Sequence, residues 1–133
     1  MHWLADEIEN LRQLAQEQSG VRGGRGKVIK AITRLVEDIG ARDDVKGSFA
    51  SHDGFLLAFG GMERGRAESL AAIAQMIVDP ALTASGRMEF GDLQQVLIVA
   101  DQEKLALLQS GTFTIGIVAK RQTHLGQSLS QKQ

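Results

Sequence analysis

A turn at Asp53-Gly54 constrains the fold of this chain more than any other feature of its sequence. The pair stands between two short runs of strand-forming residues, and the whole stretch reads VKGSFASHDGFLLAF. Asp-Gly is a favoured pair for a type I′ turn, in which both central residues need a positive φ angle. The second run stops at Gly60-Gly61. The stretch therefore predicts a β-hairpin whose second strand is apolar throughout and covered on both faces.

Further elements surround the hairpin in an order that few folds share. Apolar residues at helical spacing predict helices over 2–18, Lys27–Ile39 and Glu63–Val78. After the last helix, three apolar runs predict a meander with strands over 93–100, 104–109 and 113–119. We expect Gly40 to cap the second helix, Pro80 to end the third, and 81–87 to form a loop. This order predicts an α+β fold with a five-stranded antiparallel sheet and flanking helices.

The length of 133 residues is typical of a single domain. We expect an N-terminal helix and Gly-rich linker over 1–26, the main domain over 27–126, and a polar tail over 127–133. A formal net charge of −1 gives no global field for nucleic acid. No apolar run approaches the roughly 20 residues that a membrane-spanning helix needs, so no membrane insertion is expected. The chain has no cysteine, which suits a reducing, cytoplasmic location.

Residue patterns for catalysis are missing from the chain. The stretch GVRGGRGK at 20–27 resembles a phosphate-binding loop, but Val21 replaces the first glycine and Val28 replaces the Ser or Thr that would reach magnesium. The histidines at 2, 52 and 124 have no carboxylate or second histidine at metal-ligand spacing. We therefore expect no catalytic, cofactor-binding or metal-binding residues, and no enzyme activity.

A basic segment follows the N-terminal helix. Its members are Arg22, Arg25, Lys27, Lys30 and Arg34. Near a helix N-terminus, such a group can hold a phosphate or an acidic partner segment, and it can equally be a solvated linker. The helix over 2–18 has two interpretations as well, a packing helix or a short partner-binding helix, and the sequence leaves both open.

The helix over Glu63–Val78 carries two apolar patterns. Leu70, Ile73, Ala74 and Ile77 have the spacing of a face that packs on the sheet. Small residues form a seam beside them, and such a seam allows close approach of a second helix. The strand over 93–100 would be an apolar edge, which soluble proteins avoid unless it is paired. Facing away from the predicted core are Glu68, Ala72, Gln75 and Asp79.

Three segments together resemble the Roadblock family of dynein light chains and bacterial GTPase regulators. They are VKGSFASHDGFLLAFGG, AESLAAIAQMI and GDLQQVLIVADQEKLALLQSGTFTIGIVA. The resemblance implies a Roadblock/profilin-like domain that pairs with a second copy through the strand after the central helix, with the two central helices side by side. The implied dimer interface comprises Ala67, Ala71, Val78, Leu93, Val96 and Ile98. The implied partner-binding surface comprises Arg64, Arg66, Glu68, Ala72, Gln75 and Asp79.

Two departures from the family pattern concern the ends of the chain. The helix over 2–18 is additional, and the closing helix of many members is reduced to a short polar tail. The leading hypothesis is a non-enzymatic homodimeric regulator or scaffold that binds a small Ras-like GTPase, with stimulation of GTP hydrolysis left open. Two alternatives remain, a small-ligand sensor module of the PAS or profilin-like type and an enzyme that binds nucleotide through 20–27.

Overall fold

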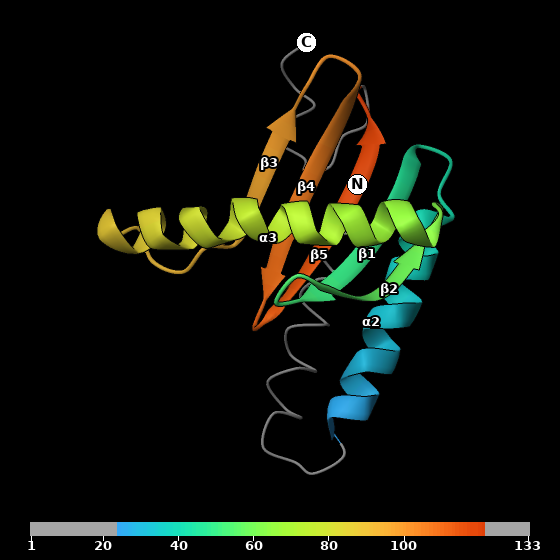
Figure 1. Ribbon diagram of the computed structural model, residues 1–133, viewed down its shortest axis with the longest axis horizontal. Coiled ribbons are helices and arrows are strands. Elements are labelled where there is room, and N and C mark those ends of the chain that lie inside the picture. Colours follow the sequence, from blue (N-terminus) through green and yellow to red (C-terminus); the bar gives the residue numbers. More distant parts are fainter. Residues whose placement is uncertain (1–23, 122–133) are drawn as a thin grey trace.

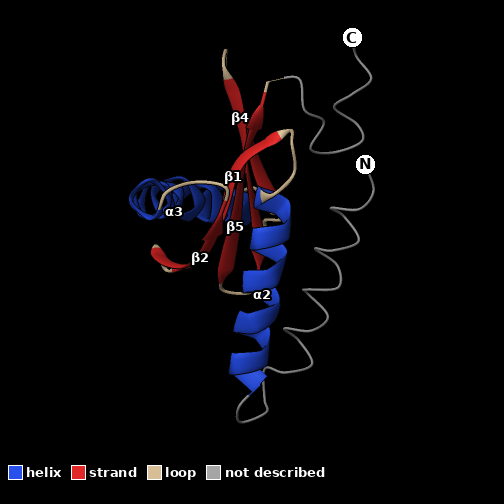
Figure 2. Cartoon of the chain, turned by 90° about the vertical axis from the view of Figure 1, so that its right-hand side faces the viewer, coloured by secondary structure: helices blue, strands red, loops and turns tan. Residues whose placement is uncertain are grey.

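The computed structural model describes residues 24–121, which form a five-stranded antiparallel sheet with one helix on each face (Figures 1 and 2). The predicted helix over 2–18, most of the linker and the polar tail lie outside the described residues. The helices are α2 (Gly24–Gly40) and α3 (Arg64–Arg87). The strands are β1 (Val45–His52), β2 (Phe55–Gly60), β3 (Gln95–Val99), β4 (Glu103–Ser110) and β5 (Phe113–Lys120). The predicted α+β fold is thus confirmed.

The β1–β2 hairpin closes as the sequence predicted. Asp53 and Gly54 have φ angles of 52° and 84°, so both central residues of the turn lie in the left-handed region. The strand order is β2-β1-β5-β4-β3, which places β2 and β3 at the two edges. Both helices pack on β2, but Phe55 at its start is 75% exposed. Complete cover of β2 was therefore a wrong expectation, because an edge strand ends beyond the reach of the helices.

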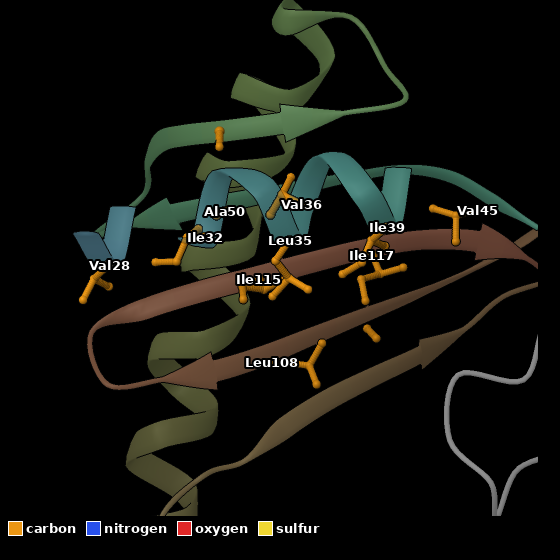
Figure 3. Packing of buried hydrophobic residues seen from close by; sticks show 12 residues of the cluster. Val28, Ile32, Leu35, Val36, Ile39, Val45, Ala50, Leu108, Ile115 and Ile117 are labelled. Carbon is orange, nitrogen blue, oxygen red and sulfur yellow. The ribbon is translucent and has the colours of Figure 1, made fainter. Parts of the chain in front are cut away.

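One core lies between α2 and the sheet (Figure 3). Its helical members follow 3.6-residue spacing, so they form one stripe along α2. They are Val28, Ile32, Leu35, Val36 and Ile39. Ser48 of β1 donates its hydroxyl hydrogen to the Val36 carbonyl, which satisfies a buried polar group. A bulge between Val45 and Gly47 interrupts the alternation of side chains along β1, so Val45 lies on the same face as Ala50.

Gly40 ends α2 for a reason other than the predicted cap. Its φ angle is not positive, so it is not a left-handed C-cap. The end of α2 instead lies directly on the end of β2. A methyl group at Gly40 would stand 2.9 Å from the Gly60 Cα and closer still to the Gly60 carbonyl. Glycine is required here because backbone meets backbone.

The second core lies between α3 and the opposite face of the sheet. The inner stripe of the helix consists of Ala67, Ala71, Ala74 and Val78, each at most 1% exposed. These side chains pack on Phe49 of β1 and Leu107 of β4. Gly116 of β5 leaves the room that the Phe49 ring occupies, because a Cβ there would overlap the ring. Small residues on the helix therefore match large residues on the sheet.

This packing corrects the predicted dimer seam. Ala67, Ala71 and Val78 are in contact with the chain's own sheet and offer no surface to a second helix. Of the residues predicted to face the sheet, Ala74 does so, whereas Ile73 is 49% exposed. Leu70 and Ile77 are half-buried at the margin of the core. The two apolar patterns of the helix have thus exchanged their predicted roles.

Pro80 does not end α3, which continues to Arg87. Proline removes the backbone donor that would bond to the carbonyl of Met76. Pro80 and Met76 are both exposed, so water can reach this carbonyl and the helix can continue. The loop predicted over 81–87 is therefore helical. Ser85 lies in the last turn, and its hydroxyl donates to the Gly91 carbonyl at 2.9 Å.

The meander agrees with the prediction except at its first strand. β3 covers only Gln95–Val99, so Leu93 precedes the strand and is half-buried against the α3 core. β4 is one residue longer than predicted at each end, and β5 is one residue longer at its C-terminal end. These are shifts of one or two residues, which are usual at the ends of elements.

We predict that Gly40→Ala lowers the free energy of unfolding by about 1–3 kcal/mol, because an added methyl group has only backbone atoms to displace. The matched control is Gly26→Ala in the same helix, where no atom lies within 4 Å of the added carbon. There we expect no loss, and a gain of up to about 1 kcal/mol from helix propensity. Urea unfolding of both variants checks this prediction, and equal effects would contradict it.

Candidate interaction surface

An apolar edge is the first part of the candidate surface. Within residues 24–121, β3 bonds to β4 alone, and the backbone groups on its other side have no partner strand there. Val96 is half-buried beneath α3, whereas Ile98 and Val99 are 38% and 47% exposed. An open edge with exposed apolar side chains is a template for pairing with another strand. The structure therefore keeps Val96 and Ile98 at the edge where the sequence placed them.

An apolar flank of α3 is the second part. Leu70, Ile73 and Ile77 are three and four residues apart, so they form one stripe beside the buried alanines. Figure 1 shows the C-terminal turns of α3 extending beyond β3, past the edge of the sheet. Leu82 in these turns is 43% exposed. The edge strand and the overhanging helix therefore expose apolar surface on the same side of the molecule.

The outer surface of α3 carries most of the residues predicted to bind a partner. Glu68, Ala72 and Asp79 are exposed, as the sequence indicated. Gln75 is half-buried because the β1–β2 turn lies close to it, with Gly54 in reach of its side chain. Its amide donates to the Asp79 carboxylate at 2.6 Å. This hydrogen bond holds the Gln75 amide and the Asp79 carboxylate beside each other on the surface of α3.

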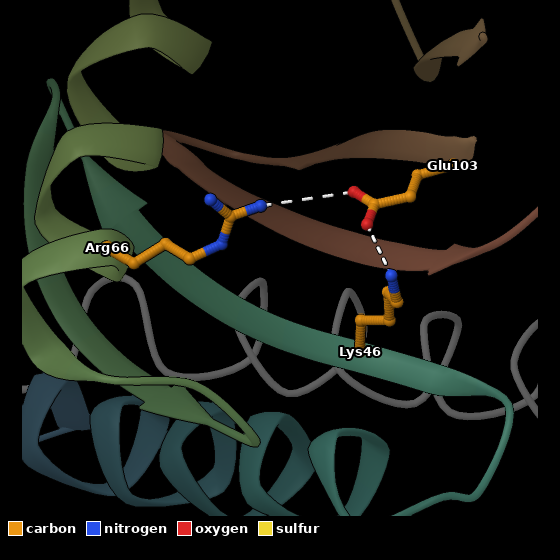
Figure 4. A network of polar contacts seen from close by, with 3 residues as sticks. All are labelled: Lys46, Arg66 and Glu103. Atoms are coloured by element: carbon orange, nitrogen blue, oxygen red, sulfur yellow. Dashed lines mark hydrogen bonds and ion pairs between the residues drawn. The ribbon is translucent and has the colours of Figure 1, made fainter. Parts of the chain in front are cut away.

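The two predicted arginines point in different directions. The guanidinium of Arg64 lies 5.5 Å from the centre of the Phe59 ring and 3.5 Å from the Glu68 carboxylate. Arg66 instead extends toward the start of β4, where it stands 3.9 Å from the Glu103 carboxylate (Figure 4). Arg64 therefore belongs with the outer surface of α3, whereas Arg66 does not.

Glu103 joins three elements by charge. Its carboxylate accepts a 2.6 Å hydrogen bond from Lys46 of β1 and faces Arg66 of α3 (Figure 4). The hydrogen bond from Lys46 lowers the pKa of the Glu103 carboxyl below its ordinary value of 4.5, and the positive charges of Lys46 and Arg66 add to this effect. Partial desolvation opposes the shift. The network links the first turn of α3 to β1 and β4.

The basic segment is only partly described. Gly24–Lys27 form the first turn of α2, and the side chains of Lys27, Lys30 and Arg34 are exposed along that helix. A depression beside them is lined by Lys30, Ala31, Arg34, Leu35 and Asp38. Among residues 24–121, no group of three or more His, Asp or Glu side chains is placed to hold a metal ion. No helix in that range is both long and apolar enough to cross a membrane.

Sequence reasoning missed the apolar residues on the outside of α3. Ile73 was expected in the core, and Met76, which is 73% exposed, was not considered. The signal that could have revealed them is the stripe of alanines, because small residues often mark the side of a helix that lies closest to a sheet. Met88 and Phe90, in the connection to β3, are 52% and 74% exposed and were missed too.

Comparison with known proteins places this geometry in a family. A model of the Roadblock/LC7 domain matches residues 32–119. MglB from Myxococcus xanthus is similar in structure, with a TM-score of 0.66 and 15% identity, covering 74% of this chain and 76% of that one. A Roadblock/LC7 domain from Streptomyces avermitilis has a TM-score of 0.62 and 20% identity, covering 67% and 78%.

Another similar structure is the gliding protein MglB from Thermus thermophilus. Its TM-score is 0.62 at 14% identity, and the match covers 78% of this chain and 83% of that one. Comparison with curated protein sequences gave no match. At these identities the structural likeness establishes the fold.

We predict that Glu103→Gln lowers stability by less than about 1 kcal/mol at neutral pH, because the ion pairs it removes are partly exposed. The pKa of Glu103 is lowered by folding, so the stabilisation is present above 4.5 and disappears as the pH falls through the folded-state pKa. Urea unfolding of both proteins at about pH 7 and about pH 3 measures the difference.

The matched control for this prediction is Glu89→Gln, which makes no ion pair with the other described residues. Its stability should differ little from that of the wild type at either pH. A Glu103→Gln deficit that persists undiminished at the lower pH would contradict the role assigned to the charge of Glu103.

Proposed function

The chain belongs to the Roadblock/LC7 domain family, and on this basis we propose that it is a homodimeric scaffold or regulator of a small Ras-like GTPase. The resemblance seen in the sequence is confirmed by the family model, and membership of this family supports the proposed role. The observation that carries the proposal is the combination of an open apolar edge at β3 with an apolar flank on α3. Both features are explained together if a second copy binds there.

The dimer follows from symmetry and chain direction. Two β3 strands that pair antiparallel about a two-fold axis produce one continuous sheet and close both open edges. The overhanging turns of α3 then lie above the partner's sheet, and the two α3 helices lie side by side. Ile73 and Ile98 become buried in this arrangement, together with the stripe of Leu70 and Ile77. This interface replaces the buried alanines of the original prediction with side chains that are accessible.

A partner surface remains on the outside of the paired helices. Glu68, Ala72 and Asp79 stay exposed in the proposed dimer, and Gln75 is held by its bond to Asp79. Ala72 is small, so a partner can approach the helix backbone closely at this point. Because both copies contribute the same residues, the dimer presents a broad polar ridge. Ala72 of each copy lies near the middle of its own α3 helix on this ridge. We assign the GTPase to this ridge.

The proposed role is that of a binding partner without catalytic groups of its own. The Gly-rich stretch at 20–27 lacks the pattern of a phosphate-binding loop, and Gly24–Lys27 continue directly into α2. Any stimulation of GTP hydrolysis must then come from ordering residues that the GTPase itself supplies. This part of the proposal predicts no hydrolase activity for the isolated chain.

Two neighbouring substitutions on α3 test the two surfaces against each other. We predict that Ile73→Arg converts the dimer to a monomer in light scattering, because a charge would be buried without a partner. Ala72→Arg introduces the same side chain on the outer surface, so the dimer should persist. We also predict that Ala72→Arg weakens binding to the GTP-loaded GTPase by tenfold or more, about 1.4 kcal/mol.

The binding partners for this test are the Ras-like GTPases of the source organism, each loaded with a non-hydrolysable GTP analogue or with GDP. Biolayer interferometry measures their affinity for the wild type and for Ala72→Arg. A monomeric wild type at micromolar concentration would overturn the dimer. Unchanged affinity of an intact Ala72→Arg dimer would move the partner site away from α3.

A further inference from the structure

The apolar flank of α3 continues past the end of the chain's own sheet. Its apolar residues recur at steps of three and four, which places them in one row along the helix. We call this row the α3 flank, and its members are Leu70, Ile73, Ile77, Ala81, Ala84 and Met88. Val78 is the last apolar residue of α3 that is buried, so the turns after it extend beyond the edge strand β3 (Figure 1). Half of the α3 flank therefore lies over its own sheet and half lies beyond it.

Side-chain size is distributed unevenly along the α3 flank. The half over the chain's own sheet carries Ile73 and Ile77, whereas the overhanging half carries Ala81 and Ala84. Ile73 is 49% exposed, and Ala84 is exposed as well. Because an alanine side chain ends at Cβ, another side chain can approach the helix backbone closely in the overhanging half. The flank thus offers large side chains in one half and space for large side chains in the other.

The position of a two-fold axis at the β3 edge follows from the spacing of strands. Paired strands are about 4.8 Å apart, so the axis between two β3 strands lies about 2.4 Å beyond β3. Val78 packs in the same core cluster as Val96 of β3. With a rise of 1.5 Å per residue, the axis crosses α3 one or two residues after Val78. It therefore passes close to the level of Asp79, between Ile77 and Ala81 on the flank.

Two α3 helices that run antiparallel about this axis place large side chains against small ones. Ile77 and Ala81 are each two residues from Asp79, so Ile77 faces the partner's Ala81. Ile73 and Ala84 are six and five residues from Asp79, so they also lie opposite each other. A parallel pair would instead place each isoleucine against the same isoleucine and each alanine against the same alanine. That arrangement produces crowding at one level and a cavity at the next.

The sheet beneath the overhanging half fits the same arrangement. Ile98 of β3 lies on the α3 face, because its cross-strand neighbour Leu105 packs with the α3 core. Ile98 is 38% exposed in the single chain. In the pair, the overhanging half of one helix lies above the partner's β3. The small side chains of Ala81 and Ala84 leave room there for the partner's Ile98.

We propose that the α3 flank is a self-recognition surface on which Ile73 and Ile77 of each copy pack against the partner's Ala84 and Ala81, so that the chain pairs with an identical copy in preference to a different Roadblock/LC7 domain. The proposal rests on the homodimer proposed above and adds its register and its selectivity. A different domain with a bulky residue at the level of Ala84 would clash with Ile73. A domain with small residues at both levels would leave a cavity.

Cysteine crosslinking tests the register. Because the chain has no cysteine, engineered thiols are the only sites of oxidation. Ile73→Cys with Ala84→Cys should give a covalent dimer with a mild oxidant, since a disulfide joins Cα atoms less than about 7 Å apart. Within one helix these positions are about 16 Å apart, so the disulfide must join two chains. Neither single variant should crosslink, because each position is far from its own copy.

The matched control is Ala72→Cys with Thr83→Cys, which has the same spacing on the exposed outer surface of α3 and should not crosslink. Crosslinking of a single variant would show a parallel pair. Faster crosslinking of Ile73→Cys with Ala81→Cys would show a different register. Absence of any crosslink in a protein that light scattering shows to be a dimer would overturn this proposal alone. A monomeric wild type would overturn the homodimer on which the proposal rests.

An exchange of the two side chains tests the contact between them. Ala84→Ile alone should weaken dimerisation about tenfold or more, because the partner's Ile73 already fills the space. Adding Ile73→Ala to the same chain restores the match of large with small, so the double variant should dimerise like the wild type. Ile73 belongs to neither core cluster of the chain, so its replacement leaves the core intact. A double variant that stays as weak as Ala84→Ile would overturn the contact.

Subunit exchange measures the selectivity. Wild-type chains that carry donor and acceptor fluorophores should mix freely, and chains of the double variant should mix freely with one another. A mixed dimer of the two types contains one contact between two isoleucines and one between two alanines. Mixed dimers should therefore form about tenfold less readily than either pure dimer. Equal formation of mixed and pure dimers would overturn the claim that the α3 flank selects an identical copy.

Discussion

The contact between the alanine stripe of α3 and the large side chains of the sheet is the interaction on which the rest of the structure depends. Ala71 and Ala74 allow the helix backbone to lie close to the strands, and Phe49 fills the space between them. Full burial of a side chain of this size contributes about 1.5–3 kcal/mol. Gly116 is part of the same contact, because any side chain there would displace the Phe49 ring.

This contact decides what α3 exposes. With small residues turned inward, the larger apolar residues of the helix are left at its flank and on its outside, where Ile73 is half exposed. The edge strand β3 lies on the same side and leaves Ile98 accessible. A single chain therefore exposes apolar side chains at one edge of its sheet. Pairing with a second copy removes these side chains from water. The function we propose follows from this arrangement, since a continuous sheet places two α3 helices beside each other.

The order of elements could be predicted from the sequence because each has a local cause. Asp53-Gly54 specifies its turn by backbone conformation, and the apolar stripe of α2 specifies the face that it buries. The orientation of α3 could not be predicted in this way. Two apolar stripes compete on that helix, and the choice between them depends on the bulk of Phe49 and Leu107 across the interface, which no local pattern reveals. Val96 and Ile98 lie on an edge strand, as the sequence indicated, whereas Ala67, Ala71 and Val78 of α3 are buried against the chain's own sheet.

The predictions for Pro80 and Gly40 were wrong for the same reason, because tertiary contacts override the local preference of each residue. Pro80 has a strong local preference to end a helix, but it lies on the exposed side of α3, where water can satisfy the carbonyl that it leaves without a donor. Gly40 has the local appearance of a cap, but its small size serves the contact between α2 and the end of β2. In each case the decisive neighbour is distant in the sequence. The candidate surface was harder to predict than the fold because its residues are defined by what the core leaves exposed.

The central claim is that β3 is the edge at which two copies join, and amide hydrogen exchange measures this most directly. The account predicts that the amides of Gln95–Val99 that do not bond to β4 become protected as the protein concentration rises, while the outer amides of β2 continue to exchange rapidly. Exchange at β3 that is independent of concentration, or protection that appears at β2 instead, would contradict it.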